Sequence, residues 1–505
     1  MRTTIRHAFT RRKLLLVVIL LAAVAAYADT APSWSRLGNF AGSGEDRGTS
    51  VKVDKLGNRY VTGSFSATAT FNGQTLVSSG DTDIFLAKFA QDGSLLWVVR
   101  AGGAGHDEGT DIAFDSQGNV YLTGWFTQSA TFTSVNGTVK TRTGIGESIF
   151  LAKYTPSGNV VWVFKGVQVT TNNITRGFGL AINPSAGSIY ITGIAQGATA
   201  FTSADGQLYQ VPGPWTWHMV LVKYDLRGQF QWGESNEASP NSVPHRVAVD
   251  ASNNAYVTGW FEAQAIFHSA DGNDQSITGL SGPVQHSPDY PSDAFLVKYD
   301  GNGNLQWVND IGGYKAVAND VAAGSDGSVS ITGFVGNISG GSSTQAETIV
   351  TSQAPGANIS LGGGQFTSPY NRDVFVATYD HTGVLQNAVR IGGANQDAGS
   401  GITYDDLGSL YVSGVFQGLI DVGGQTLNGT QTNNLFVLKY TAGSLAWAVE
   451  ADGAGTQDFE QNPRLGTRPG SNKVFVTGAY SGTATFGNIT LHSAGADDVF
   501  AMALK

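Results

Sequence analysis

Apolar and polar residues alternate along most of the chain in short stretches, and each stretch ends at a turn rich in glycine, asparagine or aspartate. A period of two is typical of β-strands that bury one face, whereas no stretch after the N-terminal segment keeps the 3.6-residue period of a helix. The pattern therefore predicts an all-β protein made of four-stranded antiparallel units. The clearest copy has strands at 51–53, 60–71, 76–89 and 95–99, with a tight hairpin turn at Asn72-Gly73.

A Thr-Gly or Ser-Gly pair, preceded by a β-rich run, recurs along the chain at intervals of 61 to 81 residues. Self-similarity of this kind predicts one repeat architecture rather than the three domains that 505 residues suggest at about 150 residues each. Four-stranded units repeated radially form a β-propeller with the first strand of each blade innermost. Seven copies predict seven blades, at Thr62-Gly63, Thr123-Gly124, Thr192-Gly193, Thr258-Gly259, Thr332-Gly333, Ser413-Gly414 and Thr477-Gly478.

The two ends of the chain distinguish a ring from a linear solenoid, which is the structural alternative. The last unit stops after its third strand at Lys505, and a strand with the missing tryptophan lies near the other end, at 34–37. We expect the strand near 34–40 to pair with the last blade, 458–505, because this pairing closes the ring and hides two sheet edges.

Tryptophan recurs in the fourth strand of six units, while the fifth unit has Asn387 in its place. An indole between two blades buries about 150–250 Å² of surface. We therefore interpret these tryptophans as structural contacts between blades and expect the blade with Asn387 to form the weakest junction. They are Trp34, Trp97, Trp162, Trp232, Trp307 and Trp447.

Three motifs connect the units to a known family. Gly-Asn-x-Tyr-Val/Leu-Thr-Gly-x-Phe occurs at 118–126, Asp-x-Phe-Leu-x-Lys-Tyr at 293–299, and Gly-x-Leu-x-Trp at 303–307. On these motifs the chain resembles the bacterial seven-bladed β-propeller repeat family called SBBP, over essentially all of residues 34–505. The resemblance implies an exported bacterial propeller, and it implies no shared catalytic residues.

The N-terminal segment has the features of an export signal. Five basic residues precede an apolar run from Leu14 to Ala26, and Ala26-Tyr27-Ala28 offers the small-x-small pattern of a cleavage site. We expect residues 1–28 to be a signal peptide, and residues 29–505 to be one monomeric propeller that is secreted, at the cell surface or in the periplasm. No later apolar run reaches the length of about 18 residues that a membrane span needs, so we expect no transmembrane segment in the mature chain.

Composition excludes several functions. Without cysteine, the chain has no disulfide, thiolate metal site or cysteine nucleophile. A net charge of −10, with no basic stripe, argues against a nucleic-acid partner. The common metalloprotease, serine-hydrolase and nucleotide-binding motifs are also missing from the sequence. We therefore expect no catalytic residues and no cofactor.

Aspartates recur at two equivalent positions of the repeat, which propeller geometry places toward one face. Two interpretations stay open: each carboxylate caps backbone N–H groups of a nearby loop, or the first set shares a cation such as Ca²⁺. The first set, before the third strand, is Asp83, Asp293, Asp373 and Asp498, where other blades have Ser148, His218 and Asn434. The second set, in the links between blades, is Asp46, Asp107, Asp397 and Asp458.

The link between the second and third strands is longest in blades 3 to 5, and long loops on a rigid scaffold are where binding residues tend to lie. Aromatic side chains with polar neighbours suit stacking on sugar rings or a protein contact. The alternative is that the tryptophan pair packs its own loop against the blade. The candidate ligand-binding residues are Trp215, Trp217, His218, His286, Tyr290, Tyr370 and Arg372.

These features together predict a non-catalytic binding or scaffold propeller that recognises a protein or glycan outside the cell or in the bacterial envelope, for instance in adhesion. A polysaccharide-active lyase or hydrolase, or an envelope-assembly scaffold, using the same loop face are the alternatives.

Overall fold

The computed structural model describes residues 31–38, 40–169, 174–279, 292–313, 315–336, 348–361, 371–454 and 463–504. Every regular element in these ranges is a β-strand, and all strand pairs in the sheets are antiparallel, so the all-β prediction is confirmed. The described ranges contain no helix that is long and apolar enough to cross a membrane. The predicted signal peptide, residues 1–28, lies outside them.

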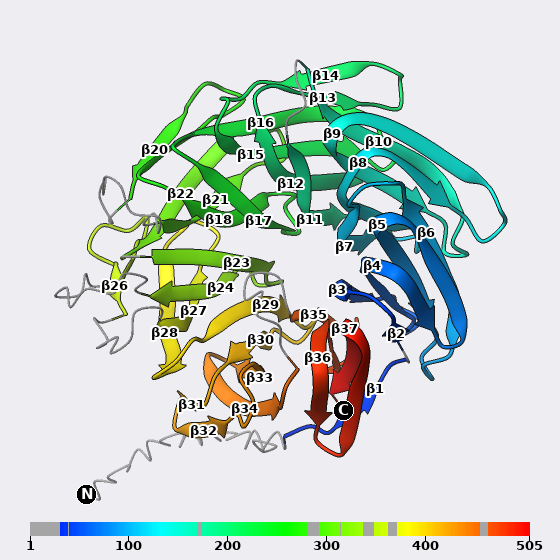
Figure 1. Ribbon diagram of the computed structural model, residues 1–505. Coiled ribbons are helices and arrows are strands. Elements are labelled where there is room, and N and C mark those ends of the chain that lie inside the picture. The colour runs from blue at the N-terminus through cyan, green and yellow to red at the C-terminus, as the bar shows by residue number, and fades with distance from the viewer. Residues whose placement is uncertain are drawn as a thin grey trace, which may run out of the picture.

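Successive strands form four-stranded meanders arranged around a common centre (Figure 1). In chain order the meanders are β3 (Asp46–Val53), β4 (Arg59–Phe71), β5 (Gln74–Phe89) and β6 (Leu95–Gly102); β7 (Glu108–Phe114), β8 (Val120–Thr133), β9 (Val139–Tyr154) and β10 (Val160–Gln168); β11 (Thr175–Asn183), β12 (Ser188–Gln196), β15 (Trp217–Asp225) and β16 (Phe230–Ser239); β17 (Ser242–Val249), β18 (Ala255–Phe261), β21 (Asp293–Tyr299) and β22 (Leu305–Gly312); β23 (Lys315–Ala323), β24 (Val329–Gly336), β27 (Arg372–Tyr379) and β28 (Leu385–Gly393); and β29 (Ala398–Tyr404), β30 (Leu410–Phe416), β33 (Asn434–Thr441) and β34 (Ser444–Ala451).

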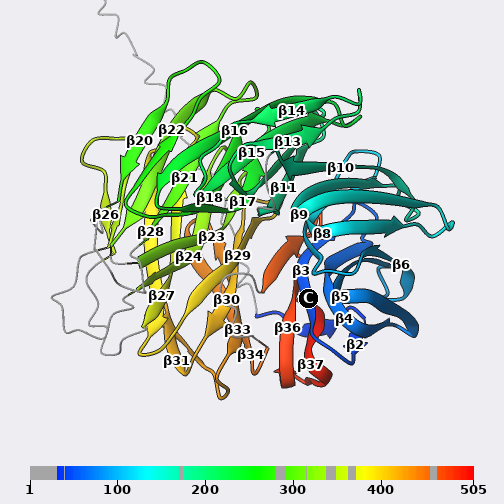
Figure 2. The ribbon, with the colours of Figure 1, turned by 45° about the horizontal axis from the view of Figure 1, so that its top comes forward.

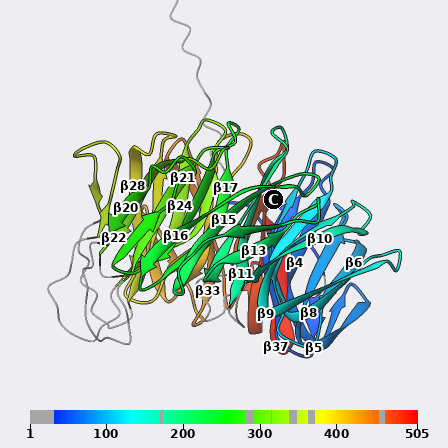
Figure 3. The ribbon, with the colours of Figure 1, turned by 90° about the horizontal axis from the view of Figure 1, so that it is seen from above.

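The remaining sheet joins the two ends of the described chain. It contains β35 (Arg464–Thr467), β36 (Val474–Phe486), β37 (Ile489–Leu504) and, as its fourth strand, β1 (Trp34–Arg36), with Trp34 opposite Leu504. The first strands of consecutive meanders contact one another from β3 to β35, and β35 contacts β3. The view from the side shows the sheets standing next to one another (Figure 3).

The repeated Thr-Gly or Ser-Gly pair has the same structural cause in six meanders, from that of β3 to that of β29. The first strand of each contains a β-bulge opposite the pair, for example between Gly48 and Ser50. The bulge brings the Arg47 carbonyl so close to Gly63 that a Cβ atom there would lie 1.8 Å from the oxygen, so only glycine fits. The buried Thr62 hydroxyl donates to the Phe85 carbonyl at 2.7 Å. The pair therefore connects the first three strands of a meander.

The long links between second and third strands differ from the expected surface loops. Their described parts form hairpins that pair with the fourth strand of the preceding meander and extend its sheet (Figure 2). This pairing satisfies the outer edge of one sheet with hydrogen bonds from its neighbour. The hairpins of the long links are β13 (Thr199–Thr202) with β14 (Leu208–Val211), β19 (Gln264–Phe267) with β20 (Gln275–Thr278), and β25 (Ile349–Val350) with β26 (Ile359–Ser360); the shorter link of the β29–β34 meander forms a similar hairpin, β31 (Leu419–Val422) with β32 (Gln425–Asn428).

The hydrophobic core lies between the faces of adjacent meanders rather than inside any one of them. One cluster joins Leu86 and Trp97 of the β3–β6 meander to Leu122 and Phe150 of the next. A sheet buries an apolar face only against another sheet, so each meander depends on its neighbours for a core.

Candidate functional site

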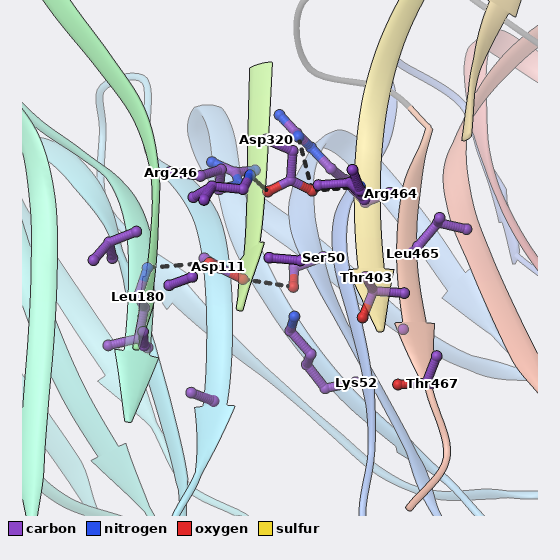
Figure 4. Close-up of a pocket in the computed structure, with 18 of the residues that line it drawn as sticks. Ser50, Lys52, Asp111, Leu180, Arg246, Asp320, Thr403, Arg464, Leu465 and Thr467 are labelled. Atoms are coloured by element: carbon purple, nitrogen blue, oxygen red, sulfur yellow. Dashed lines mark hydrogen bonds and ion pairs between the residues drawn. The ribbon is translucent and has the colours of Figure 1, made fainter. Parts of the chain in front are cut away.

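A central channel lies between the first strands of the meanders, where its cavity has a volume of about 350 Å³. Strands β3, β7, β11, β17, β23, β29 and β35 all line it. Most of its lining is aliphatic or small, so a few charged side chains determine its chemistry (Figure 4). They are Lys52, Asp111, Arg246, Asp320 and Arg464.

The two aspartates connect neighbouring first strands. Asp111 on β7 accepts from the backbone N–H of Leu180 on β11 at 3.1 Å and from the Ser50 hydroxyl on β3 at 2.8 Å. Asp320 on β23 accepts from the backbone N–H of Ile402 on β29 at 3.0 Å. Each carboxylate thereby accepts a hydrogen bond from a backbone N–H group of the next meander. The two strands joined in this way are not paired through their backbones.

The two arginines bind to strands that precede their own in the chain, whereas the aspartates bind to the N–H groups of the strand that follows. Arg464 on β35 donates to the Ser400 carbonyl on β29 and, at 3.1 Å, to the Asn319 carbonyl on β23, and its guanidinium lies 3.6 Å from Asp320. Arg246 on β17 donates to the Phe178 carbonyl on β11. The charged groups therefore act first as connections between the inner strands.

A three-residue order repeats around the channel. The residues that pair with the Thr or Ser of the repeated Gly pair are Asp111, Gly179 and Arg246 in three successive meanders, then Asp320, Gly401 and Arg464 in the next three, and Ser50 in the β3–β6 meander. The glycine that precedes each arginine in this order allows the arginine's strand to approach closely. A Cβ atom at Gly179, for example, would lie 2.9 Å from the Arg246 Cα atom.

Lys52 differs from the other charged residues of the channel. It projects into the cavity toward Ser50 and Asp111 (Figure 4), and no described residue forms a hydrogen bond or ion pair with it. Since Asp111 already accepts from Ser50, Ile112 and Leu180, the Lys52 ammonium is the channel cation with capacity for a ligand.

The candidate acids form pairs, one from each predicted set. A Cβ atom at Gly102 would lie 2.4 Å from an Asp83 oxygen and 2.9 Å from an Asp107 oxygen. The two carboxylates therefore approach the same place beside this glycine. Asp107 accepts from the backbone N–H groups of Gly103 at 2.7 Å and Thr127 at 2.9 Å. Asp83 accepts from the Arg100 guanidinium and the Ser79 N–H, but its Oδ1 atom is buried without a donor among the described residues.

Burial is the main electrostatic influence on these pairs. Burial, together with the smaller effect of the nearby Asp83 carboxylate, raises the pKa of Asp107 to about 7, although the two backbone N–H groups lower it. The same causes raise the pKa of Asp397 to about 8 beside Asp373, and burial together with Asp498 raises that of Asp46 to about 7. In each pair the raised pKa favours the protonated form of one carboxyl group, which removes the repulsion between two buried carboxylates.

The predicted cation site is not assembled by the described residues. Asp83, Asp293, Asp373 and Asp498 are all buried, but they lie on the third strands of different meanders. Within the described ranges, no group of three or more His, Asp or Glu side chains is arranged to hold a metal ion. Asp458 lies outside those ranges.

The candidate loop residues have different environments. Trp215 is 62% exposed, whereas every other tryptophan of the chain is buried or half-buried. His218 is buried, with Nδ1 3.0 Å from the Thr216 carbonyl, and burial lowers its pKa. Arg372 lies over the Phe334 ring, 4.3 Å from its centroid. Trp217 is half-buried, and His286, Tyr290 and Tyr370 lie outside the described residues.

The fourth-strand tryptophans mark contacts between meanders. The indole N–H groups of Trp97, Trp232 and Trp307 donate to carbonyls in the last turn of the next meander, at 3.1, 3.1 and 3.3 Å. Trp162 and Trp447 lie against Tyr121 and Tyr411 of their own meanders, with ring centroids 5.7 and 6.0 Å apart.

Trp34 has another environment. In the β3–β6 meander, Trp97 pairs with Lys88, and the residue equivalent to Lys88 in the last sheet is Ala503. Trp34, however, pairs with Leu504, the next residue along the strand. This one-residue offset turns the Trp34 indole toward Phe486, and its N–H donates to the Glu450 carbonyl at 3.2 Å.

The channel residues were missed because each is isolated in the sequence. An alignment of the first strands on the Thr-Gly pair would have shown the Asp-Gly-Arg order twice, but only the packing of the strands brings Lys52, Arg246 and Arg464 into one cavity.

Residues 96–125 match the SBBP family model, the β-propeller repeat. The match runs from β6 to the start of β8 and confirms the resemblance expected from the motifs. An uncharacterised WD repeat-containing protein of Acanthamoeba polyphaga mimivirus is 25% identical over 243 residues, which are 44% of this chain and 17% of the relative.

Solved structures with detectable similarity have low sequence identity. Quinohemoprotein alcohol dehydrogenase from Comamonas testosteroni is 10% identical, covers 94% of this chain and 76% of its own, and has a TM-score of 0.37. Streptogramin B lyase is 11% identical with coverages of 76% and 94% and a TM-score of 0.30. A β-propeller domain from Myceliophteria thermophila is 10% identical with coverages of 78% and 99% and a TM-score of 0.27.

Proposed function

We propose that this protein is a non-catalytic binding or scaffold propeller whose seven meanders close into one ring. The contact between β35 and β3 and the pairing of β1 with β37 support closure. We further propose that the protein is exported in a bacterium and recognises a glycan or protein of the envelope, as in adhesion. The N-terminal sequence pattern supports export.

The exposed indole of Trp215 is the observation that carries this proposal. Its ring lies on Gly197, where a Cβ atom would approach within 3.2 Å of the indole, and the Gly197 N–H donates to the Pro214 carbonyl at 2.5 Å. An aromatic ring held in this way stacks on a sugar or a partner side chain with little loss of side-chain entropy.

Binding rather than cleavage is favoured by the location of the carboxylates. Asp83 and Asp107, the pair that resembles an acid–base pair, are both fully buried. A polysaccharide-active enzyme needs its two carboxyl groups beside the glycosidic bond, which a polymer does not reach in the core of a sheet junction.

The test is retention of the purified mature chain on immobilised envelope extract and on a panel of polysaccharides. Trp215→Ala is expected to reduce retention at least about fivefold, by loss of a stacking contact of about 1 kcal/mol or more, with unchanged melting temperature. Leu419→Ala, at an equally exposed outer position, is the matched control. Equal retention of both variants refutes the Trp215 binding face, and release of shortened saccharides would support the enzyme instead.

A further inference from the structure

A second cavity, of about 380 Å³, lies at one mouth of the channel among the turns that connect meander strands. Its apolar lining is formed by Leu56, Phe114, Pro156, Pro184 and Pro469, which we call the channel-mouth cup. Residues far apart in the sequence form it, so it exists only in the assembled fold.

The cup is rigid and partly open to solvent. Leu56 is 78% exposed, although its turn is fixed by Asp54, which accepts from the N–H groups of Leu56 at 2.9 Å and Asn58 at 2.8 Å. The three prolines have restricted backbones. An apolar surface that cannot collapse onto itself remains available to a ligand.

The border of the cup has as many lysines as aspartates, so it is less acidic than the chain as a whole, whose net charge is −10. Lys55 and Lys88 line it, while its two acids, Asp54 and Asp115, already accept backbone N–H groups of their own turns. Carboxylates held in this way are less repulsive to an approaching anion than free ones.

The cup is continuous with the channel. Val53 and Phe114 belong to the linings of both cavities. Lys52 is the residue next to Val53 on β3, and its ammonium points into the channel (Figure 4). A molecule that fills the cup can therefore extend past Val53 to this ammonium.

We propose that the channel mouth binds an organic anion with an apolar body, which occupies the cup while its acidic head group pairs with Lys52. An apolar cavity with a few charged groups at one end is typical of small-molecule sites. This site is separate from the Trp215 surface, so either proposal can fail without the other.

The test uses 1-anilinonaphthalene-8-sulfonate, an aromatic sulfonate whose fluorescence rises in apolar surroundings, with the purified mature chain. We expect saturable binding of one probe per chain and displacement by octanoate more readily than by octanol. Lys52→Gln is expected to weaken binding about tenfold, whereas Lys52→Arg keeps it, because only the first removes the charge. Leu56→Ser should also weaken binding, since it removes apolar surface from the cup.

The matched controls are Lys140→Gln, at a half-buried position, and Leu419→Ser, at an exposed one, both on other strands; they should bind as the unmodified chain does. Circular dichroism of each variant verifies folding. The proposal is overturned if Lys52→Gln and Lys140→Gln bind equally, if octanol competes as well as octanoate, or if the probe binds without saturation.

Discussion

Two junctions between neighbouring meanders solve the same packing problem with different residues. In the β3–β6 meander, Tyr60, Lys88 and Trp97 lie side by side on three strands. Lys88 and Trp97 both donate to the Pro156 carbonyl of the next meander, at 3.0 and 3.1 Å, and the Lys88 ammonium lies 4.9 Å from the centre of the Tyr60 ring.

The β23–β28 meander has Ser330, Thr378 and Asn387 at these three positions. Here the next meander supplies the large side chain instead: the Tyr404 hydroxyl lies 2.7 Å from that of Ser330, which in turn lies 2.7 Å from that of Thr378. In the first junction, the equivalent of Tyr404 is Phe114, with its ring 4.7 Å from that of Tyr60.

The difference shows that the three positions change together. Losing tryptophan alone would leave a gap and an unsatisfied carbonyl, whereas the change to three small polar residues makes room for a tyrosine from the other side. The junction at Asn387 is therefore not a tryptophan junction with a gap, because Tyr404 of the next meander makes a contact there instead. Its predicted weakness depends on the strength of this tyrosine contact.

Among variants at the two junctions, Trp97→Ala is expected to have the largest effect on stability. The variant loses a buried indole and its hydrogen bond across the junction, so it should reduce the free energy of unfolding by about 3–5 kcal/mol. Urea unfolding followed by circular dichroism measures this. Asn387→Ala at the equivalent position is the control, with a change within about 0.5 kcal/mol; similar losses in both variants would show that the junctions do not differ.

Lys88→Met tests the cation at the first junction. It keeps most of the aliphatic packing but removes the charged hydrogen bond to Pro156 and the contact with Tyr60, so we expect a loss of about 2 kcal/mol in the same unfolding measurement. Thr378→Val, at the equivalent position of the other junction, should cost less. A larger effect at Thr378 would contradict the assigned roles.

An acid pair is common to both junctions, and it predicts a pH dependence. Since the folded protein raises the pKa of Asp107 from 3.8 to about 7, the folded state holds a proton that the unfolded state has released. The stability should therefore fall as the pH rises from about 4 toward 7. Asp107→Asn removes the carboxyl group that titrates, so it should flatten this dependence by about 1 kcal/mol or more.

The same reasoning extends the pH window at the second junction, where the pKa of Asp397 rises to about 8. Asp397→Asn should flatten the dependence up to that pH, while Asp421→Asn, at an exposed carboxylate, should leave it unchanged. Unfolding free energies are measured from pH 5 to 8.5; parallel curves for all variants would mean that the buried carboxyl groups do not titrate in this range.

Tyr404→Phe should have the smallest effect, because it removes one hydroxyl and leaves the ring. We expect a loss of about 1 kcal/mol by urea unfolding. Phe114→Tyr is the reciprocal change, and it should be neutral or unfavourable because Tyr60 offers its ring, not a hydroxyl, at that place. A stabilising Phe114→Tyr would show that the two junctions follow one rule.

Much of the fold was predictable because its signals are local. Alternation gave the strands, the Thr-Gly pair marked the second strand of each repeat, and the tryptophans marked the fourth. Trp34 shows the limit: its strand was found, but its register is one residue away from that of the other tryptophans, because a three-residue strand takes its register from its partner.

The site was less predictable than the fold. The exposed ring of Trp215 was among the candidates, but neighbouring His218 is buried. The links expected to be free loops form, in their described parts, hairpins on the preceding sheet. A long polar segment gives no local signal that distinguishes a surface loop from a strand that pairs with a distant edge.

By itself, then, the sequence determined the strand pattern, the recurrence of the Thr-Gly pair and the position where tryptophan is absent, since each depends on residues within one unit. The tertiary structure alone decided that Asp111 binds the N–H of Leu180, that Asp83 meets Asp107, and that Lys52 faces a channel. These contacts depend on how each meander is rotated against its neighbour, and that rotation is set by the packing of whole sheet faces.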